Sequence, residues 1–188
     1  MRDKETVDIA IEASLTWHLV LSTIHTNNAA ETITRILNMG VQPFLIPASL
    51  NIIIAQRLVK RVCDKCKQPM PISEIDPVTL KNIKHSLWVT PKEELLARVW
   101  AEKLKAPSFY KAVGCDVCQW NGYKGRVGIY EMLEISPGVK EMILRGDSAF
   151  NINRQAIKDG MISLEQDGII KALQGHTTLE EVYRVSKT

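Results

Sequence analysis

The only four cysteines of this chain stand in two Cys-x-x-Cys pairs, Cys63 with Cys66 and Cys115 with Cys118. A Cys-x-x-Cys turn places two sulfurs within reach of one ion, and two such turns complete a tetrahedral shell. Zinc suits four soft sulfur ligands and needs no open coordination position in a structural site. The pairs therefore predict a small subdomain in which two distant segments are fixed to one metal ion.

Two other uses of the four cysteines are considered, namely a pair of disulfides and a redox centre of the thioredoxin type. Residues 1–8 are rich in charge and lack the apolar core of a signal peptide, so we expect a reducing compartment. Structural disulfides are rare in such compartments, which favours the metal site.

Size and charge limit the functional classes. A chain of 188 residues has room for one ordinary domain and a small one. Its formal charge is +3, and a divalent ion bound by four thiolates would lower this to about +1. This balance gives no argument for a nucleic-acid partner or an anionic membrane. The most apolar stretch, residues 44–55, is too short to span a bilayer.

The first third of the chain predicts helix, strand and helix. Val7, Ile11 and Leu15 recur every four residues, which predicts a helix over residues 4–15. Residues 18–24 form a short apolar run with β-branched members, typical of a parallel strand buried on both faces. Asn28 then begins a second helix with Glu31 as its capping-box partner, and Gly40 ends it. This order indicates a piece of an α/β layer.

The remaining patterns predict mainly helices, with strands beside each cysteine pair. Trp88, Trp100, Leu95 and Leu96 are expected to form a small core over the metal. Thr177 with Glu180 predicts a capping box before the last helix. The expected elements are a short helix at 43–51, a strand within 52–62, strands at 109–113 and 127–133, and helices at 77–85, 92–105, 139–145, 148–158, 163–174 and 178–186.

Two histidines flank the predicted strand at residues 18–24. His18 and His25 are an odd number of positions apart, so they cannot share one face of a regular strand. His25 lies between the strand and a helix N-terminus, where open α/β sheets place groups that face a ligand. The alternative is that both are structural histidines whose nitrogens bond to backbone groups.

Three segments, in order along the chain, resemble one protein family. Residues 2–6 (RDKET) resemble the tail of the Walker B region of secretion ATPases, and residues 17–28 (WHLVLSTIHTNN) resemble their histidine box. Residues 55–62 (AQRLVKRV), the cysteine pairs and residues 122–131 (GYKGRVGIYE) resemble their metal-binding subdomain and its exit strand. The chain is thus similar to the type II secretion and type IV pilus assembly ATPases, hexameric motors of the RecA-like class.

The resemblance implies an α/β fold made of the C-terminal part of a RecA-like P-loop ATPase core, an inserted tetracysteine zinc-binding subdomain and a C-terminal helical region. The implied divisions are residues 1–62, 63–125 and 126–188. It also implies a homo-hexamer that couples ATP hydrolysis to protein secretion or pilus extension. Such a motor lies on the cytoplasmic face of the bacterial inner membrane, against membrane platform proteins and without nucleic acid.

The resemblance assigns roles to individual residues. His25 becomes a sensor of the nucleotide's terminal phosphate and His18 its orienting or coupling partner. Arg2 and Asp3 match the Walker B tail. Arg57 and Arg126 are candidates for contact with a phosphate or a neighbouring subunit, or are surface arginines.

One departure from the family is Trp17, which stands where relatives usually have a small residue. A second is that no G-x-x-x-x-G-K-[ST] motif occurs in the sequence. ATP and Mg²⁺ are therefore expected only in a longer protein, and this chain is expected to resemble a C-terminal fragment that does not hydrolyse ATP. The alternatives are a zinc-ribbon module that binds nucleic acid through Lys60–Lys67, Trp120 and Tyr123, and a protein-interaction domain.

Overall fold

A computed structural model of the chain describes residues 1, 3–88 and 108–186. The chain forms two compact units, and neither is continuous in sequence. Unit 1 contains Met1–Ala55 and Glu131–Met161, and unit 2 contains Gln56–Tyr130 and Ile162–Thr188. These boundaries fall inside two long strands rather than beside the cysteine pairs. The three-part division expected from the family remains a prediction about domain organisation.

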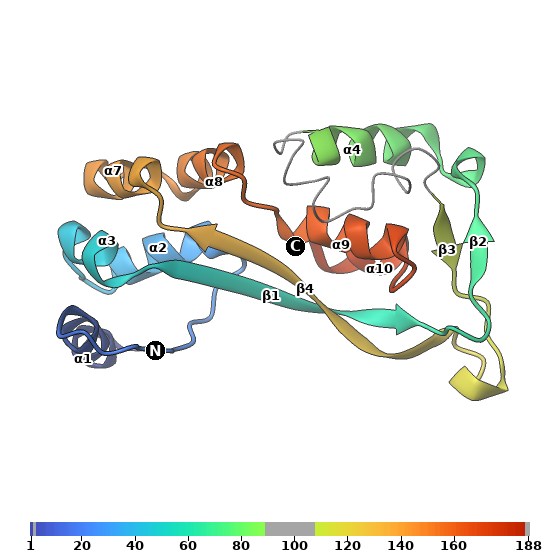
Figure 1. The fold of residues 1–188 in the computed structure, drawn as a ribbon, viewed down its shortest axis with the longest axis horizontal. Helices are drawn as coiled ribbons and strands as arrows, with labels where there is room; N and C mark the ends of the chain where they lie inside the picture. The colour runs from blue at the N-terminus through green and yellow to red at the C-terminus, as the bar shows by residue number, and fades with distance from the viewer. Residues whose placement is uncertain (2, 89–107, 187–188) are drawn as a thin grey trace. The chain divides into compact units, whose positions relative to one another are not determined.

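Strands β1 (Ile52–Val62) and β4 (Tyr123–Glu134) pair with each other and run in opposite directions (Figure 1). Backbone bonds flank the pair, from the Ile135 N–H to the Asn51 carbonyl and from the Cys63 N–H to the Gly122 carbonyl. Between these bonds β4 uses one residue more than β1, which requires a bulge. Gly125 within β4 has φ of +79°, the left-handed conformation that a glycine bulge uses. The strand expected within residues 52–62 is confirmed, and that at 127–133 lies within the longer β4.

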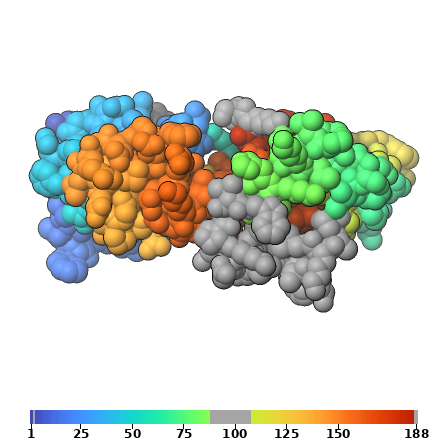
Figure 2. Space-filling view, turned by 90° about the horizontal axis from the view of Figure 1, so that it is seen from above, coloured from blue at the N-terminus to red at the C-terminus, as the bar shows by residue number. Residues whose placement is uncertain are grey.

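Unit 1 is built mainly from helices around one apolar core. Helix α2 packs on α8, α7 packs on the 3-10 turn η1 and on α3, and α1 packs on α3. Figure 2 shows the orange side chains of α7 and α8 lying directly against the light-blue side chains of α2 and α3. Their buried core includes Ile33, Ile46, Leu133, Ile143 and Ile152. The elements are α1 (Lys4–Leu15), α2 (Ala29–Asn38), η1 (Pro43–Leu45), α3 (Ile46–Ser49), α7 (Pro137–Arg145) and α8 (Ala149–Lys158).

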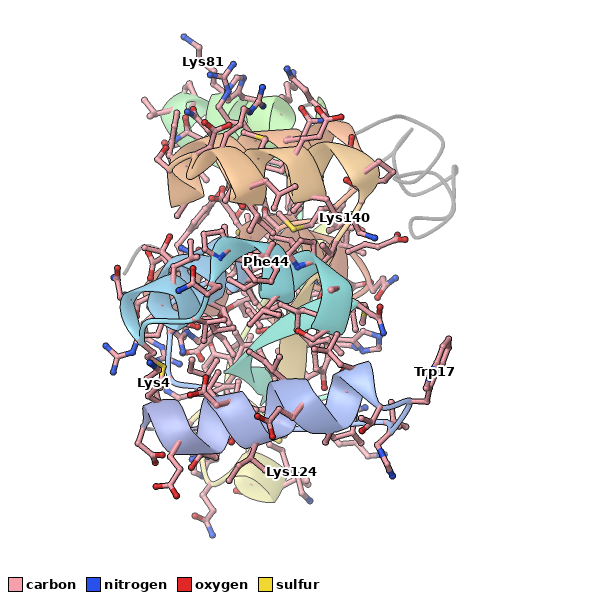
Figure 3. All side chains as sticks on the ribbon, turned by 90° about the vertical axis from the view of Figure 1, so that its left-hand side faces the viewer. Lys4, Trp17, Phe44, Lys81, Lys124 and Lys140 are labelled. Carbon is pink, nitrogen blue, oxygen red and sulfur yellow. The ribbon has the colours of Figure 1, made fainter. Side chains whose placement is uncertain are left out.

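The strand expected at residues 18–24 is absent, which corrects the sequence-based prediction. Residues 18–24 belong to no helix or strand, and the side chains of Leu19 and Leu21 are each 86% exposed. Trp17 is 99% exposed, and Figure 3 shows its ring pointing away from the ribbon beyond the end of α1. A buried parallel strand needs paired neighbours and a covering layer on each face. None of the described strands pairs with this segment, so its β propensity is not realised.

The described residues of unit 2 form a second small sheet and three helices. Strands β2 (Gln68–Met70) and β3 (Phe109–Lys111) pair antiparallel, with Pro69 opposite Tyr110. Phe109 is fully buried among apolar side chains of α4 and α9, including Ile83, Ile169 and Leu173. The other elements are the 3-10 turns η2 (Ile72–Glu74) and η3 (Asp116–Cys118) and the helices α4 (Pro77–Trp88), α9 (Leu164–Leu173) and α10 (Leu179–Ser186).

Two predictions for unit 2 are not confirmed. The helix expected at 92–105, and with it the core of Trp88, Trp100, Leu95 and Leu96 over the metal, lies outside the residues whose side chains are described. The predicted cap of the last helix is wrong by one residue, because Thr178 Oγ1 accepts the Glu181 N–H at 3.3 Å. The described helices include none with the length and apolar character needed to cross a membrane.

Side chains of α9 bind backbone groups of β4 within unit 2. The carboxylate of Asp167 accepts the Tyr130 N–H at 2.8 Å, and the Lys171 ammonium donates to the Gly128 carbonyl at 2.7 Å. Lys171 and Asp167 also form an ion pair at 2.5 Å, one helical turn apart. Because these partners satisfy N–H and C=O groups that pair with no third strand, they close the edge of a two-stranded sheet.

Candidate metal centre

The first cysteine pair lies in a tight turn at the end of β1. The Cys63 N–H donates across to the Gly122 carbonyl at 2.9 Å, which fixes the start of the turn against the second strand. The Cys63 carbonyl then accepts from the N–H groups of Cys66, at 3.3 Å, and Lys67, at 3.0 Å. These bonds fold the chain back on itself and aim both sulfurs to one side.

The second pair forms a matching turn around η3. The Cys115 carbonyl accepts from the N–H groups of Cys118, at 3.1 Å, and Trp120, at 2.9 Å. Gln119 and Trp120 adopt left-handed backbone conformations with φ of 52° and 63°, which are uncommon for residues with a side chain. The surroundings of the turn at Cys115–Cys118 therefore hold its backbone in a conformation of raised free energy.

Two glycines permit the close packing of these turns. Gly114 has φ of +114°, and a Cβ there would lie 2.7 Å from the Trp120 carbonyl oxygen. Gly122 has φ of +77°, and a Cβ there would lie 2.7 Å from the Ala112 Cβ. Both the left-handed conformation and the lack of space exclude other residues without a local shift.

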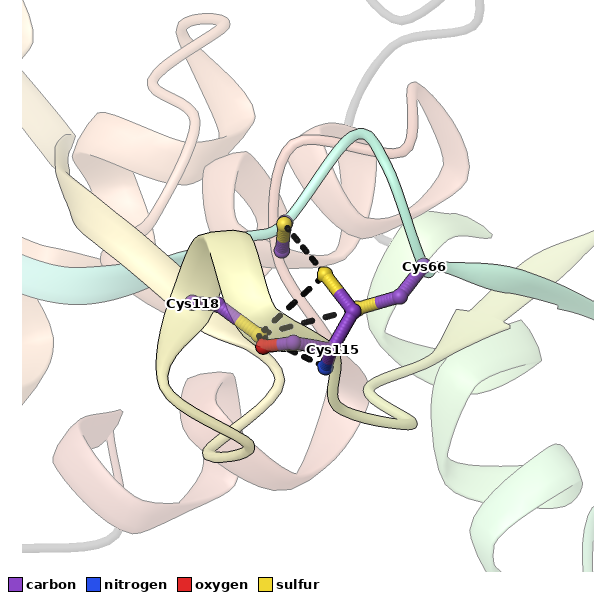
Figure 4. Close-up of side chains that lie close together, drawn as sticks. Cys66, Cys115 and Cys118 are labelled. Carbon is purple, nitrogen blue, oxygen red and sulfur yellow. Dashed lines mark hydrogen bonds between the residues drawn. The ribbon is translucent and has the colours of Figure 1, made fainter.

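The two turns bring all four sulfurs together. All Sγ atoms lie within 4.8 Å of one another, and Figure 4 shows the labelled side chains of Cys66, Cys115 and Cys118 converging. The distances are 4.0 Å from Cys63 to Cys115, 3.8 Å from Cys66 to Cys118 and 3.8 Å from Cys115 to Cys118. For Zn–S bonds of about 2.3 Å, sulfurs at the corners of a regular tetrahedron are about 3.8 Å apart. The donor set and its spacing therefore fit one zinc ion.

The same geometry bears on the two other uses considered for the cysteines, a pair of disulfides and a redox centre. All four cysteines are free thiols, and the four sulfurs form a single cluster rather than two separate pairs. Within residues 1, 3–88 and 108–186, it is the one group of three or more histidine, cysteine or acidic side chains suited to a metal.

Backbone donors act on the sulfurs. The Gly114 N–H donates to the Cys66 sulfur at 3.3 Å, and the Cys115 N–H donates to the Cys118 sulfur at 3.2 Å. Burial raises the pKa of the Cys66 thiol to about 11 despite its donor. Burial also raises the pKa of Cys118, but the N–H groups of Cys115 and Gly122 oppose it and bring the value to about 7. Since thiolates are the ligand form, metal binding must release protons.

The basic residues beside the first pair have partners of their own. Four of them, Lys60, Arg61, Lys65 and Lys67, stand within three residues of a cysteine of that pair. Arg61 and Lys67 bind the Asp64 carboxylate at 2.9 and 2.7 Å, and Lys60 lies 3.6 Å from the Glu181 carboxylate. Asp64 carries one negative charge against two cations, and Glu181 is shared between Lys60 and Arg184, so these carboxylates match only part of the positive charge.

A second set of residues was expected to serve nucleotide chemistry. Of these, His18, His25 and Asp3 belong to no group of side chains suited to a metal within the described part of the chain. His18 and His25 are both exposed, and the His18 Nδ1 lies 3.1 Å from the Thr16 hydroxyl. Asp3 caps α1 by accepting from the Thr6 backbone at 2.9 Å. Arg2 lies outside the described residues. Of the two arginine candidates, Arg57 is half-buried in β1 and Arg126 is exposed in β4.

A buried carboxylate that the sequence interpretation missed occupies the start of α2. Glu131, 4% exposed, accepts the Ala29 N–H at 2.8 Å, and Asn28 accepts the Glu31 N–H at 2.8 Å. The helix end that was expected to face a ligand is thus satisfied by the protein itself. A signal was available, because Glu131 lies between Ile129 and Leu133 at a spacing of two and so shares their buried face of β4.

Comparison with known proteins agrees with these features. Residues 1–184 match the sequence profile of the family described as Type II/IV secretion system protein. The chain is 45% identical over 188 residues to the Type IV pilus assembly ATPase PilB of Pseudomonas aeruginosa, covering 100% of this chain and 30% of that protein. It is 43% identical over 182 residues to PilB of Myxococcus xanthus, covering 97% and 29%.

A third relative comes from the secretion branch. The Type II secretion system protein E of Aeromonas hydrophila is 41% identical over 187 residues, covering 100% of this chain and 33% of that protein. The chain thus spans about a third of the length of these relatives. The match over residues 1–184 and the identities of 41% to 45% lead to one conclusion: this chain belongs to the type II/IV secretion system protein family.

Proposed function

We propose that this chain is the C-terminal part of a motor ATPase that couples ATP hydrolysis to protein secretion or pilus extension. The observation that carries the proposal is the family match over residues 1–184, together with relatives named as pilus assembly ATPases and secretion proteins. In this proposal the chain completes a RecA-like core, and the motor is a homo-hexamer. It acts at the cytoplasmic face of the inner membrane, against platform proteins of the secretion or pilus machine.

The residues present do not fit a nucleotide on their own. The sequence has no phosphate-binding G-x-x-x-x-G-K-[ST] loop, and the first amide of α2 already donates to Glu131. We therefore assign ATP and Mg²⁺ to the full-length motor, with His25 sensing the terminal phosphate and His18 as its coupling partner. Arg2 and Asp3 belong to the Walker B tail, and Arg57 and Arg126 contact phosphate or a neighbouring subunit.

Histidine substitutions in the full-length motor test this assignment. His25→Ala should lower kcat by about a hundredfold or more with little change in KM, because the side chain acts on charge that develops in the transition state. His85→Ala is the matched control, since His85 is an exposed histidine on α4 with no assigned role. Equal kcat values for the two variants would contradict the role of His25.

The isolated chain supplies a second test. It should show no ATP turnover above the background of a sample without protein. Turnover comparable to that of the full-length motor would contradict the proposal that ATP hydrolysis requires the full-length protein. A gel shift at moderate salt separates the motor proposal from a nucleic-acid module, which would bind tightly and with strong salt dependence.

The tetracysteine cluster is proposed to hold a structural zinc ion. When bound, the ion supplies a closed tetrahedral link between the two cysteine turns, with no position open to substrate. Elemental analysis of the reduced protein should give one zinc per chain. Cys115→Ser combined with Cys118→Ser should abolish it, whereas a zinc-free wild-type protein would refute the assignment.

A further inference from the structure

The turn between α9 and α10 holds the strand that leads into the first cysteine pair. The Thr177 hydroxyl donates to the Lys60 carbonyl at 2.8 Å, and the Val62 N–H donates to the His176 carbonyl at 3.0 Å. The Lys60 N–H donates to the Glu181 carboxylate at 2.9 Å. The end of β1 next to Cys63 is therefore bound by backbone and side-chain groups of the C-terminal region.

Glu181 is the centre of this contact. Its side chain is almost fully buried, and both carboxylate oxygens accept from Arg184, at 3.0 Å from Nε and 2.8 Å from Nη2. The Lys60 ammonium lies 3.6 Å from the same carboxylate. Burial raises the pKa of Glu181, but the Arg184 and Lys60 bonds oppose this and hold it below its ordinary value. Glu181 is thus a buried, ionised group on α10 whose backbone partner is β1.

The same turn also contacts segments beside the other ligands. The Lys67 ammonium, one residue after Cys66, donates to the Gly175 carbonyl at 3.0 Å. The Tyr123 hydroxyl, at the start of β4, lies 3.0 Å from the Thr178 hydroxyl. Residues 175–178 therefore touch both sides of the metal centre, which are themselves joined by the Cys63–Gly122 backbone bond.

We propose that Glu181 is a positioning residue for the metal centre, and that metal binding and docking of α10 stabilise each other. The proposal rests on the zinc site proposed above. A rigid β1 end presents Cys63 in place for the ion, and a bound ion in turn holds the β1 end against which Glu181 docks. Because such coupling is reciprocal, a substitution that abolishes docking lowers metal affinity by the factor by which metal strengthens docking, and one that only weakens docking lowers it by less.

The size of the effect follows from the group removed. Glu181→Ala leaves the Lys60 N–H and the Arg184 guanidinium without their buried carboxylate partner. A hydrogen bond to a charged group that is lost in a buried site changes an equilibrium by about tenfold to a hundredfold. We therefore expect zinc affinity to fall by up to that factor in Glu181→Ala, and by less in Glu181→Gln, whose amide oxygen still accepts the Lys60 N–H.

Zinc competition against a chromophoric chelator measures this with the 188-residue chain. Glu180→Ala is the matched control, because Glu180 is the exposed neighbour on the same helix. The control should bind zinc within about twofold of wild type. Cobalt-loaded samples should keep the absorption of four-sulfur coordination in every variant, which shows that the ligand set is unchanged. Equal zinc affinities for Glu181→Ala and Glu180→Ala would overturn the proposal.

Hydrogen exchange on the wild-type chain gives an answer even where Glu181→Ala does not fold. Zinc should slow exchange of the α10 amides, while amides of α7 and α8 in unit 1 should exchange at unchanged rates. Unchanged α10 exchange in a chain that does bind zinc would refute the coupling alone. A wild-type chain that binds no zinc would instead refute the metal site on which the coupling depends.

Discussion

Replacing Gly122 by alanine should destabilise the metal turns by more than its backbone conformation alone explains. Gly122 and Gly125 have nearly the same φ, +77° and +79°, so alanine meets a similar left-handed cost at both positions. That cost is about 1–2 kcal/mol. The two sites differ in the space around the added Cβ.

At Gly122 the new Cβ would lie 2.7 Å from the Ala112 Cβ and 2.9 Å from the Ala112 carbonyl carbon, whereas at Gly125 nothing lies within 4 Å. Backbone atoms cannot rotate away as a flexible side chain can, so the β4 start or the Ala112 segment must shift. Such overpacking costs about 1–3 kcal/mol. We expect a free energy of unfolding lowered by about 2–5 kcal/mol in Gly122→Ala and by about 1–2 kcal/mol in Gly125→Ala.

Urea denaturation of the zinc-loaded proteins, followed by far-UV circular dichroism, measures the difference. Zinc competition should show weaker binding in Gly122→Ala as well, because the Gly122 carbonyl accepts the Cys63 N–H. Two variants whose unfolding free energies agree within about 0.5 kcal/mol would refute the argument from close packing.

Three further predictions concern unit 1. Leu133→Ala should cost about 2–5 kcal/mol of stability in urea denaturation, because Leu133 is fully buried, and the exposed Leu144→Ala should change little; equal effects would mean that the β4 face is not core. Glu131→Ala should cost about 1–3 kcal/mol and speed hydrogen exchange at the first amide of α2, which loses its acceptor; unchanged exchange there would contradict the contact. The Thr6 backbone and hydroxyl bonds lower the pKa of Asp3 below 3.8, so its capping of α1 is present above that pH and lost as the pH falls through the lowered value; an NMR titration midpoint above 3.8 would exclude this.

Local patterns predicted most elements because their causes are local. The helix expected at 4–15 matches α1 at both ends, and residues 52–62, which were expected to include a strand, contain β1. Asp3 supplies the α1 cap from the adjacent residue, and the Cys-x-x-Cys spacing fixes two sulfurs within a single turn. The four predicted ligands accordingly form the cluster.

The two predictions that were wrong concern features that depend on distant parts of the chain. Residues 18–24 have strand-like composition, but a strand forms only with a partner, and none of the described strands provides one. Thr177 is a residue type that often caps helices, but its hydroxyl donates to the Lys60 carbonyl, far away in sequence. Thr178 caps α10 instead. In both cases a distant segment decides between uses that are locally equivalent.

The sequence alone determined the two cysteine pairs, the family resemblance and the periodic helices, since each depends on residue type and short-range spacing. Tertiary structure alone decided that Glu131 neutralises the start of α2 and that Glu181 binds the strand beside Cys63. A buried carboxylate is tolerated only where donors converge on it, and for each of these two acids one donor comes from far away in sequence, 102 positions for Ala29 to Glu131 and 121 for Lys60 to Glu181. No local pattern specifies which donor will meet which acid, because that choice is made by the packing of the whole unit.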